Sequence, residues 1–330
     1  MMKAIKSLSG LMLLLWGALC FAFQQGHTDS NIPHPIADIE QKLQFEMFEL
    51  KEVAEFKYLQ LQAKVAHVKL PKRVTLRFHD ETEIQAKWKT SEKGGKAFNN
   101  QPRYEVASYA FQKLFLDPEN FVVPPTVVRC LHVRQCRGVD SDAKPTFKQS
   151  DDVFFVLQYW LSNVSQDSVF DETRFESDVD YAKHLGNMNV FSFLVRHSDS
   201  NAGNMLVSTD PENPRVFAVD NGIAFGKAES ERGTEWRDLR VSRVPRNTIE
   251  RLRSLQKKEL ERDLGVVAQF EVQGGRFVPA PPTANLNPKK GVRQKGDVVQ
   301  FGLTQKEIDG IASRLKKLLQ RIDSGRITTF

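Results

Sequence analysis

Three oxygen-bearing side chains are spaced along the sequence in a way that suits the binding of a metal ion and a phosphate. Asp199 precedes Asn204 by five residues in "DSNAGN", and Asp220 opens "DNG". Between Asn204 and Asp220, the segments "MLVS" and "RVFAV" flank the turn "TDPENP", which predicts a short antiparallel hairpin. Because the start of one hairpin strand lies beside the end of its partner, the three side chains would converge.

These residue types fit the transfer of a phosphoryl group from ATP. Mg²⁺ or Mn²⁺ takes carboxylate and amide oxygens from one or two protein groups, while phosphates complete its shell. Asn204 and Asp220 would bind the metal, and Asp199 would accept the proton of an attacking hydroxyl. Kinases place their base Asp, metal-binding Asn and metal-binding Asp-Gly in this order. Either motif alone also fits ordinary structure, since "DNG" favours a type I′ turn and "DSNAG" a surface loop.

A second group of residues upstream supplies a cation for the phosphates. In "EIQAKWKT" the alternation of a strand sends Lys87 and Lys89 to the same face, roughly 6 to 7 Å apart. Glu105 lies in the first turn of a helix expected from about Arg103, where the helix dipole favours a carboxylate even without a partner. A kinase needs a lysine on the phosphates and an acid that holds it. Spacing alone leaves both lysines open, with a solvated strand face as the alternative.

The elements that must position these residues begin with a segment of helical periodicity. Residues 38–62 have apolar residues at helical spacing and predict a long amphipathic helix. "RVTLRF" and "EIQAKWKT" then predict a hairpin, and a second strand pair follows around residues 122–133. "DDVFFVLQYW" predicts a fully buried strand.

The later part of the chain is dominated by helical patterns from Phe175 onward. Residues 276–296, rich in Pro and Lys, predict an exposed loop. Thr304 and Glu307 predict the capping box of a final helix. A strand-rich first half and a helix-rich second half predict an α+β fold of two lobes, with a ligand cleft between them.

Several segments together resemble the atypical kinases related to the secretory-pathway Golgi casein kinases, with likeness to type II phosphatidylinositol 4-kinases and bacterial spore-coat kinases. They are "AKWKT", "RYEVASYAFQKLF", "VPPTVV", "GNMNVFSFLVRHSDSNAGN" and "VFAVDNGIAFG", roughly within residues 80–226.

The resemblance implies a protein-kinase-like fold with a small strand-rich N-lobe and a larger helical C-lobe. From the resemblance together with the patterns along the chain, we expect a signal peptide (1–22), a leader with an N-terminal helix (23–68), the N-lobe (69–160) and the C-lobe (161–330).

The resemblance also assigns roles to single residues. In that family a strand lysine often precedes a proline, and Lys89 stands where that lysine would, so it is preferred to Lys87. Glu105 is then implied to pair with Lys89, Asp199 to act as the catalytic Asp, and Asn204 and Asp220 to bind metal.

Two departures from ordinary kinases keep a second function open. No glycine occurs between Gly26 and Gly94, so the glycine-rich phosphate cover is missing, and Ser198 replaces the arginine of His-Arg-Asp. The alternative to an enzyme is a pseudokinase-like module that binds a nucleotide or a partner without turnover. The hydroxyl acceptor of an active enzyme, whether protein, glycan or lipid, carries no motif.

The N-terminus predicts export. In "MMKAIKSLSGLMLLLWGALCFA", Lys3 and Lys6 precede a short apolar run and small residues, as in a secretory signal peptide, with an uncleaved anchor as the alternative. Residues 1–22 would then be removed, and no membrane span is expected afterwards. The mature protein would be secreted, periplasmic or in the lumen of the secretory pathway.

The cysteines and the net charge limit which compartments and partners the sequence predicts. An oxidising compartment would permit a disulfide between Cys130 and Cys136, and two free buried thiols are the alternative. The pI is about 9.1, and nine basic residues lie between Arg237 and Arg262. Because acidic residues are interspersed among them, we expect an exposed helical face and no nucleic-acid partner.

Overall fold

The structure is a computed structural model of the chain, and it describes residues 29–55, 70–95, 101–167 and 169–330. The predicted signal peptide, residues 1–22, lies outside the described residues. Among the described residues, no helix combines the length and the apolar composition that crossing a bilayer requires.

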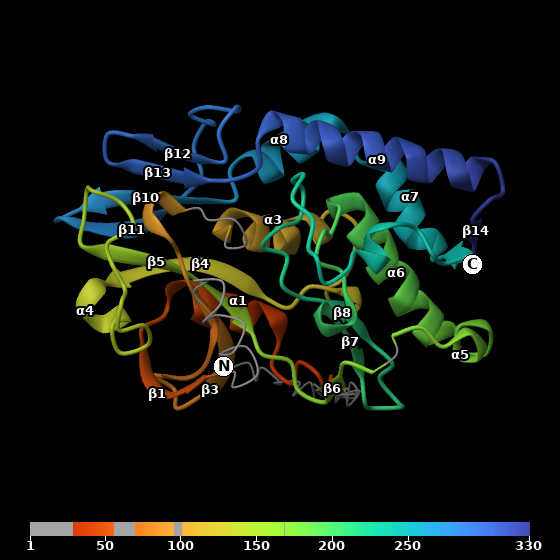
Figure 1. Cartoon of the computed structure of the whole chain (residues 1–330), viewed down its shortest axis with the longest axis horizontal. Helices are drawn as coiled ribbons and strands as arrows, with labels where there is room; N and C mark the ends of the chain where they lie inside the picture. Colours follow the sequence, from red (N-terminus) through yellow and green to blue (C-terminus); the bar gives the residue numbers. More distant parts are fainter. Residues whose placement is uncertain (1–28, 56–69, 96–100, 168) are drawn as a thin grey trace, which may run out of the picture.

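An antiparallel five-stranded sheet forms the first part of the molecule (Figure 1). Its strands, in spatial order, are β1 (Phe48–Glu55), β2 (Lys72–Phe78), β3 (Glu83–Thr90), β5 (Asp152–Tyr159) and β4 (Thr126–His132). In β3 the alternation is as predicted, since Ile84, Ala86 and Trp88 enter the core of the sheet while the lysines face the other way. All eight residues of β5 are buried, as predicted for "DDVFFVLQYW".

The long helix predicted over residues 38–62 is wrong over residues 46–55, and its last part, residues 56–62, lies outside the described residues. Helix α1 covers Ile36–Phe45, and the chain then turns into strand β1. The segment "FELKEVAE" pairs along most of its length with β2, from Phe48 opposite Phe78 to Glu55 opposite Lys72. A short segment such as residues 48–55 fits the helical and the strand periodicity about equally well, and pairing with β2 makes it a strand.

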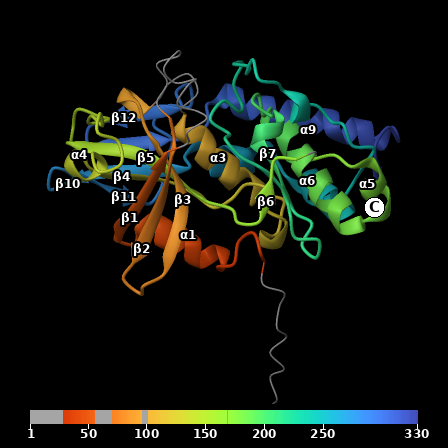
Figure 2. The ribbon, with the colours of Figure 1, turned by 60° about the horizontal axis from the view of Figure 1, so that its bottom comes forward.

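Helix α3 (Pro102–Gln112) connects this sheet to the helical part. It starts with a proline, which fits the first helical position because its missing N–H has no partner there anyway. Arg103 makes a bidentate ion pair with Glu307 of the last helix, at 2.7 and 2.9 Å. Figure 2 shows α3 between the strands β1 to β5 on one side and the helices α5, α6 and α9 on the other.

The helical part surrounds a long buried helix, α6. The helices are α5 (Glu172–Ser177), α6 (Val179–Val195), α7 (Arg246–Ser254), α8 (Lys257–Gly265) and α9 (Gln305–Asp323). Short strands accompany them: β6 (Val164–Ser165), β7 (Met205–Ser208), β8 (Val216–Ala218), β9 (Arg243–Val244) and β14 (Thr328–Thr329). The capping box of Thr304 and Glu307 at the start of α9 is formed as predicted.

A four-stranded sheet that the sequence did not predict packs against the first sheet. It has the order β11 (Arg276–Ala280), β10 (Ala268–Gln273), β13 (Val298–Phe301) and β12 (Val292–Lys295). The prediction of an exposed loop over residues 276–296 is therefore wrong at both ends and holds only for the connection between β11 and β12. Phe270, Phe277 and Phe301 surround Phe154 of β5, with ring centroids 4.8 to 5.5 Å away. The contacting residues lie far apart in sequence, so no local pattern predicts these contacts.

The possible disulfide between Cys130 and Cys136 is not formed, and both residues are free thiols. Cys130 faces the second sheet and donates to the carbonyl oxygen of Phe277 at 3.3 Å. Cys136, at the end of the short helix α4 (Val133–Cys136), packs into the core on the other side of the first sheet. The sheet itself separates the two sulfur atoms.

The observed architecture confirms the predicted α+β class, with a strand-rich first part and a helical later part. Most of the basic segment between Arg237 and Arg262 forms α7 and α8, as expected for exposed helical faces, while its first part includes the short strand β9. Its charges are partly paired, for example Arg251 with Asp117 at 2.8 Å and Lys257 with Asp309 at 2.7 Å.

Candidate active site

The predicted hairpin forms and brings Asn204 beside the residue that precedes Asp220. Strands β7 and β8 pair antiparallel, with Met205 opposite Ala218. One step further, the N–H of Val219 donates to the carbonyl oxygen of Asn204 at 2.9 Å. Asn204 and Asp220 thereby reach the same end of the hairpin, as the sequence predicts.

The loop that carries Asp199 is fixed onto this end of the hairpin. The side-chain amide of Asn204 donates to the carbonyl oxygen of Asp199 at 2.8 Å. His197, fully buried, contacts the carbonyl oxygen of Val219 through Nε2 at 3.0 Å, and its Nδ1 accepts from the Asp199 N–H at 3.4 Å. Burial lowers the pKa of His197, which keeps the ring neutral and suits one donating and one accepting nitrogen.

Lys89 lies between two carboxylates that come from different elements. Its Nζ is 3.3 Å from Glu105 of α3 and 3.0 Å from Asp220. The side chains of Lys89 and Glu105 are only 7% and 2% exposed, so water screens their attraction weakly. Burial by itself lowers the pKa of Lys89, but the charges of Asp220 and Glu105 outweigh it and raise that pKa. Lys89 is therefore held as an ammonium ion.

Lys87 also contacts Asp220, at 3.3 Å, so the structure brings both candidate lysines to the same carboxylate. Burial raises the pKa of Asp220, but Lys87 and Lys89 outweigh burial and depress it well below its usual range. The two lysines differ in their other contacts. Lys89 also pairs with Glu105, whereas Lys87 lines an open cavity. This difference agrees with the preference for Lys89.

The alternative of an ordinary hairpin turn at "DNG" does not hold, because the next strand after Asp220, β9, begins only at Arg243. Asp220 has φ of +55°, in the left-handed region, which Asp and Asn tolerate better than most residues. The next N–H, of Asn221, donates to the second oxygen of Glu105 at 3.0 Å. Glu105 thus holds both Lys89 and the backbone after Asp220.

The oxygens of Asn204 and Asp220 fit the chemistry of a Mg²⁺ or Mn²⁺ ion bound together with phosphates. The Asn204 amide nitrogen is engaged with Asp199, which leaves the amide oxygen to face a cation. Two protein groups suffice for such an ion when phosphates supply further oxygens. Within the described part of the chain, no group of three or more His, Cys, Asp or Glu side chains could hold a metal without that help.

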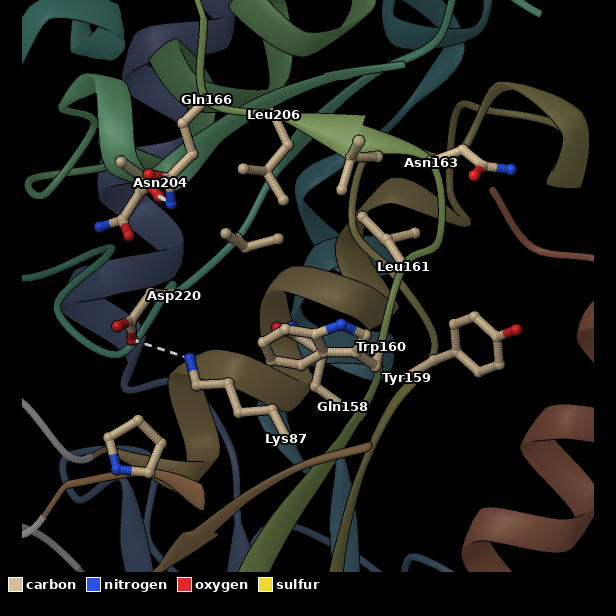
Figure 3. Close-up of a pocket in the computed structure, with 14 residues that line it drawn as sticks. Lys87, Gln158, Tyr159, Trp160, Leu161, Asn163, Gln166, Asn204, Leu206 and Asp220 are labelled. Carbon is tan, nitrogen blue, oxygen red and sulfur yellow. Dashed lines mark hydrogen bonds and ion pairs between the residues drawn. The ribbon is translucent and has the colours of Figure 1, made fainter. Parts of the chain in front are cut away.

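A cavity of about 380 Å³ opens directly beside these groups (Figure 3). Lys87, Asn204 and Asp220 form its polar side. Its other walls include Gln158, Trp160, Leu161, Leu206 and Val219. A mostly apolar cavity with a few convergent polar groups is typical of a small-molecule site. Sequence reasoning missed these wall residues, although the cluster "QYWL" at the end of the buried strand β5 was a usable signal.

Arg232 is a further residue that the sequence did not single out. Its guanidinium forms an ion pair with Asp199 Oδ2, while Asp199 Oδ1 accepts from Asn201 at 2.7 Å. Arg232 belongs to the charged segment after Gly226, and its side chain is half exposed. Only the folded chain shows that this segment returns to Asp199, helped by the Ser230 N–H, which donates to the Ser198 carbonyl oxygen at 2.9 Å.

Comparison with known proteins gives a structural likeness but no match in sequence. No protein-family model and no curated protein matches the chain. Among solved structures, the chain is similar to the one described as "The structure of hydra Fam20 with sugar", with 12% sequence identity and a TM-score of 0.48. The match covers 88% of each chain. At this identity and TM-score we conclude nothing about activity from it.

Proposed function

We propose that this protein is an exported phosphotransferase that moves the γ-phosphate of ATP to a hydroxyl acceptor with the help of Mg²⁺ or Mn²⁺. One observation carries the proposal: Asn204 and Asp220 line one cavity, a hydrogen bond ties Asn204 to Asp199, and an ion pair ties Asp220 to Lys89, although these residues come from separate segments. A structural network alone would not need a cavity of ligand size beside it.

In this proposal the cavity binds the nucleoside and the lysines bind the phosphates. The apolar walls suit a flat base, and the cation of Lys89, held by Glu105, suits the α- and β-phosphates. Asn204 and Asp220 would hold the metal, which bridges phosphate oxygens and neutralises their charge. Because Asp220 binds two lysines here, we expect phosphate to draw at least one of them away.

The transfer step uses Asp199 as the proton acceptor. The acceptor hydroxyl oxygen attacks the γ-phosphorus, the new O–P bond forms, and the bond from the γ-phosphorus to the bridging oxygen breaks, releasing ADP. The hydroxyl proton passes to the Asp199 carboxylate. Arg232 pairs with Oδ2 and Asn201 donates to Oδ1, so the acceptor hydroxyl must use a remaining lone pair of the carboxylate or displace one of these partners.

Export of the protein and a hydroxyl-bearing acceptor are also part of what we propose. The first 22 residues have the pattern of a signal peptide, and a protein, a glycan or a lipid could present the hydroxyl. The two free thiols lie on opposite faces of the first sheet, Cys130 partly buried and Cys136 buried, which explains their reduced state without reference to the compartment.

A second candidate is a nucleotide-binding module without turnover. The ion pair between Arg232 and Asp199 favours it, because a carboxylate that stays on a guanidinium is a poor base. The two candidates share the cavity and differ only in the transfer step, so a test of function must measure binding and transfer separately.

The test is transfer of labelled γ-phosphate from ATP to pooled protein, glycan and lipid acceptors, with ATP binding measured in parallel. We expect the wild type to transfer phosphate and Asp199→Asn still to bind ATP. The transfer rate of Asp199→Asn should fall at least about 100-fold, because a general base usually contributes at least that factor to the rate. Glu212→Ala, exposed at the far end of the same hairpin, is the matched control. ATP binding without any transfer by the wild type would favour the second candidate.

A further inference from the structure

Gln158 faces the proposed nucleoside cavity from strand β5. It is the direct partner of Lys87 on β3, so the two side chains lie on the same face of the sheet. Gln158 is 3% exposed, and it lines the cavity beside Trp160 (Figure 3). A polar amide buried this deeply at a cavity wall needs a hydrogen-bond partner for each of its ends.

The orientation of the Gln158 amide is fixed by its neighbour Thr126 on β4. The Thr126 hydroxyl donates its single proton to the carbonyl oxygen of Pro124 at 2.7 Å. Thr126 Oγ1 can therefore only accept from Gln158, and the atom facing it at 3.0 Å must be the amide nitrogen. Within the described part of the chain, the amide oxygen of Gln158 has no hydrogen-bond partner, and it is left to the cavity.

The two backbone N–H groups that follow Gln158 already have acceptors. The N–H groups of Tyr159 and Trp160 donate to the carbonyl oxygens of Pro125 and Gln85, at 2.8 and 2.9 Å. Ser162 donates to Asn31 in the same way, at 3.1 Å. A base that enters the cavity therefore meets, at this position, a side-chain acceptor rather than these peptide donors.

We infer that Gln158, held by Thr126, reads position 6 of the purine and selects adenine nucleotides over those with a 6-oxo group. The inference rests on the proposed function. An adenine amino group donates to the amide oxygen, whereas a 6-oxo group would place two acceptor oxygens against each other. Sites that hydrogen-bond a substrate group reject the analogue that lacks it, because a buried polar atom then stays unpaired.

The experiment compares ATP with inosine triphosphate, which carries a 6-oxo group and a proton on N1 but has the same sugar and phosphates. Both are titrated calorimetrically, with Mg²⁺, into the wild-type chain. We expect ATP to bind at least about tenfold more tightly than inosine triphosphate, because one unpaired buried polar group lowers the affinity by about that factor.

Three variants separate recognition from a structural role. Gln158→Leu should retain triphosphate binding and bring the affinity ratio of the two nucleotides close to one. Thr126→Val removes the hydroxyl that fixes the amide, so the amide can turn its nitrogen to a 6-oxo group, and the ratio should fall although Gln158 is present. Gln166→Leu changes another glutamine at the same cavity and should leave the ratio unchanged. Thermal unfolding checks each variant, and Thr126→Val keeps the test decisive if Gln158→Leu does not fold.

The outcomes also separate this inference from the proposed function. Equal affinity of the wild type for the two nucleotides overturns the inference and leaves ATP binding in place. A preference for ATP that survives in both Gln158→Leu and Thr126→Val overturns it as well. A wild type that binds neither nucleotide overturns the inference together with the proposed function.

Discussion

Lys89 and Asp220 form an ion pair of 3.0 Å although 131 positions separate them in the sequence. The pair joins strand β3 to the residues that follow strand β8, and Glu105 of α3 completes it from a third element. A phosphate-binding cation and a metal-binding carboxylate thus arise at the junction of the sheet and the helical part.

Replacing Lys89 with methionine should cost both stability and affinity. The change leaves Glu105 buried without its cation, and loss of one partner of a buried pair destabilises a protein by about 3–5 kcal/mol. ATP affinity should fall by about tenfold or more, since a charged hydrogen bond is lost. Urea unfolding and calorimetric titration measure the two effects. Lys87→Met, which leaves Glu105 paired, should lose clearly less stability; equal losses would contradict the assignment.

The contact between Arg232 and Asp199 should restrain phosphate transfer. Arg232→Ala frees the carboxylate of Asp199, so we expect the transfer rate to rise while the ATP affinity stays unchanged. The rise should be at most about fivefold, because a half-exposed ion pair contributes at most about 1 kcal/mol. Arg237→Ala serves as the control, because Arg237 pairs with Glu229 in the same segment, at 2.5 Å. A lower rate in Arg232→Ala would instead show that the guanidinium assists the transfer.

The ion pair between Arg103 and Glu307 should make stability depend on pH in mildly acidic solution. Burial raises the pKa of Glu307, but its bonds to Arg103 outweigh burial and lower that pKa below the usual 4.5. A carboxylate with a lowered pKa in the folded state stabilises the protein above 4.5, and the contribution is lost as the pH falls through the lowered value.

Unfolding free energies of wild type and Glu307→Gln, measured by urea titration from pH 7 down to pH 3, test this. The difference should be about 2–3 kcal/mol at pH 7, as for hydrogen bonds to a charged group, and should shrink toward pH 3. A difference that stays constant over this range would contradict the assigned pKa direction.

The two cysteines near β4 should remain unreactive in the native protein. Burial raises the pKa of Cys130 and of Cys136 to about 12, so neither forms a thiolate at neutral pH. Iodoacetamide should label both only after denaturation, as read by peptide mass spectrometry without a reducing agent. Recovery of a peptide with the two residues linked would show that the disulfide exists after all.

What the sequence could predict was local. The hairpin between Asn204 and Asp220 follows from two strands and a turn within 17 residues, and the capping box of Thr304 needs only four. The alternation in β3 likewise fixed which face carries Lys87 and Lys89. For this reason the candidate site residues could be named from spacing and then found together.

What the sequence could not predict depends on distant contacts. Strand β1 exists because β2 pairs with it, and the sheet of β10 to β13 exists because its phenylalanines pack on Phe154. The contact of Arg232 with Asp199 and the amide orientation of Gln158 are likewise set by residues 32 to 33 positions away. No periodicity encodes such partners.

Calorimetric titration of ATP, with and without Mg²⁺, into the wild type and Asp220→Ala tests whether Asp220 holds the metal of a nucleotide site. We expect Mg²⁺ to strengthen ATP binding to the wild type and this enhancement to be lost in Asp220→Ala, while Glu212→Ala behaves as the wild type. If Asp220→Ala binds ATP with the same dependence on Mg²⁺ as the wild type, Asp220 does not hold the metal and the proposed site is wrong.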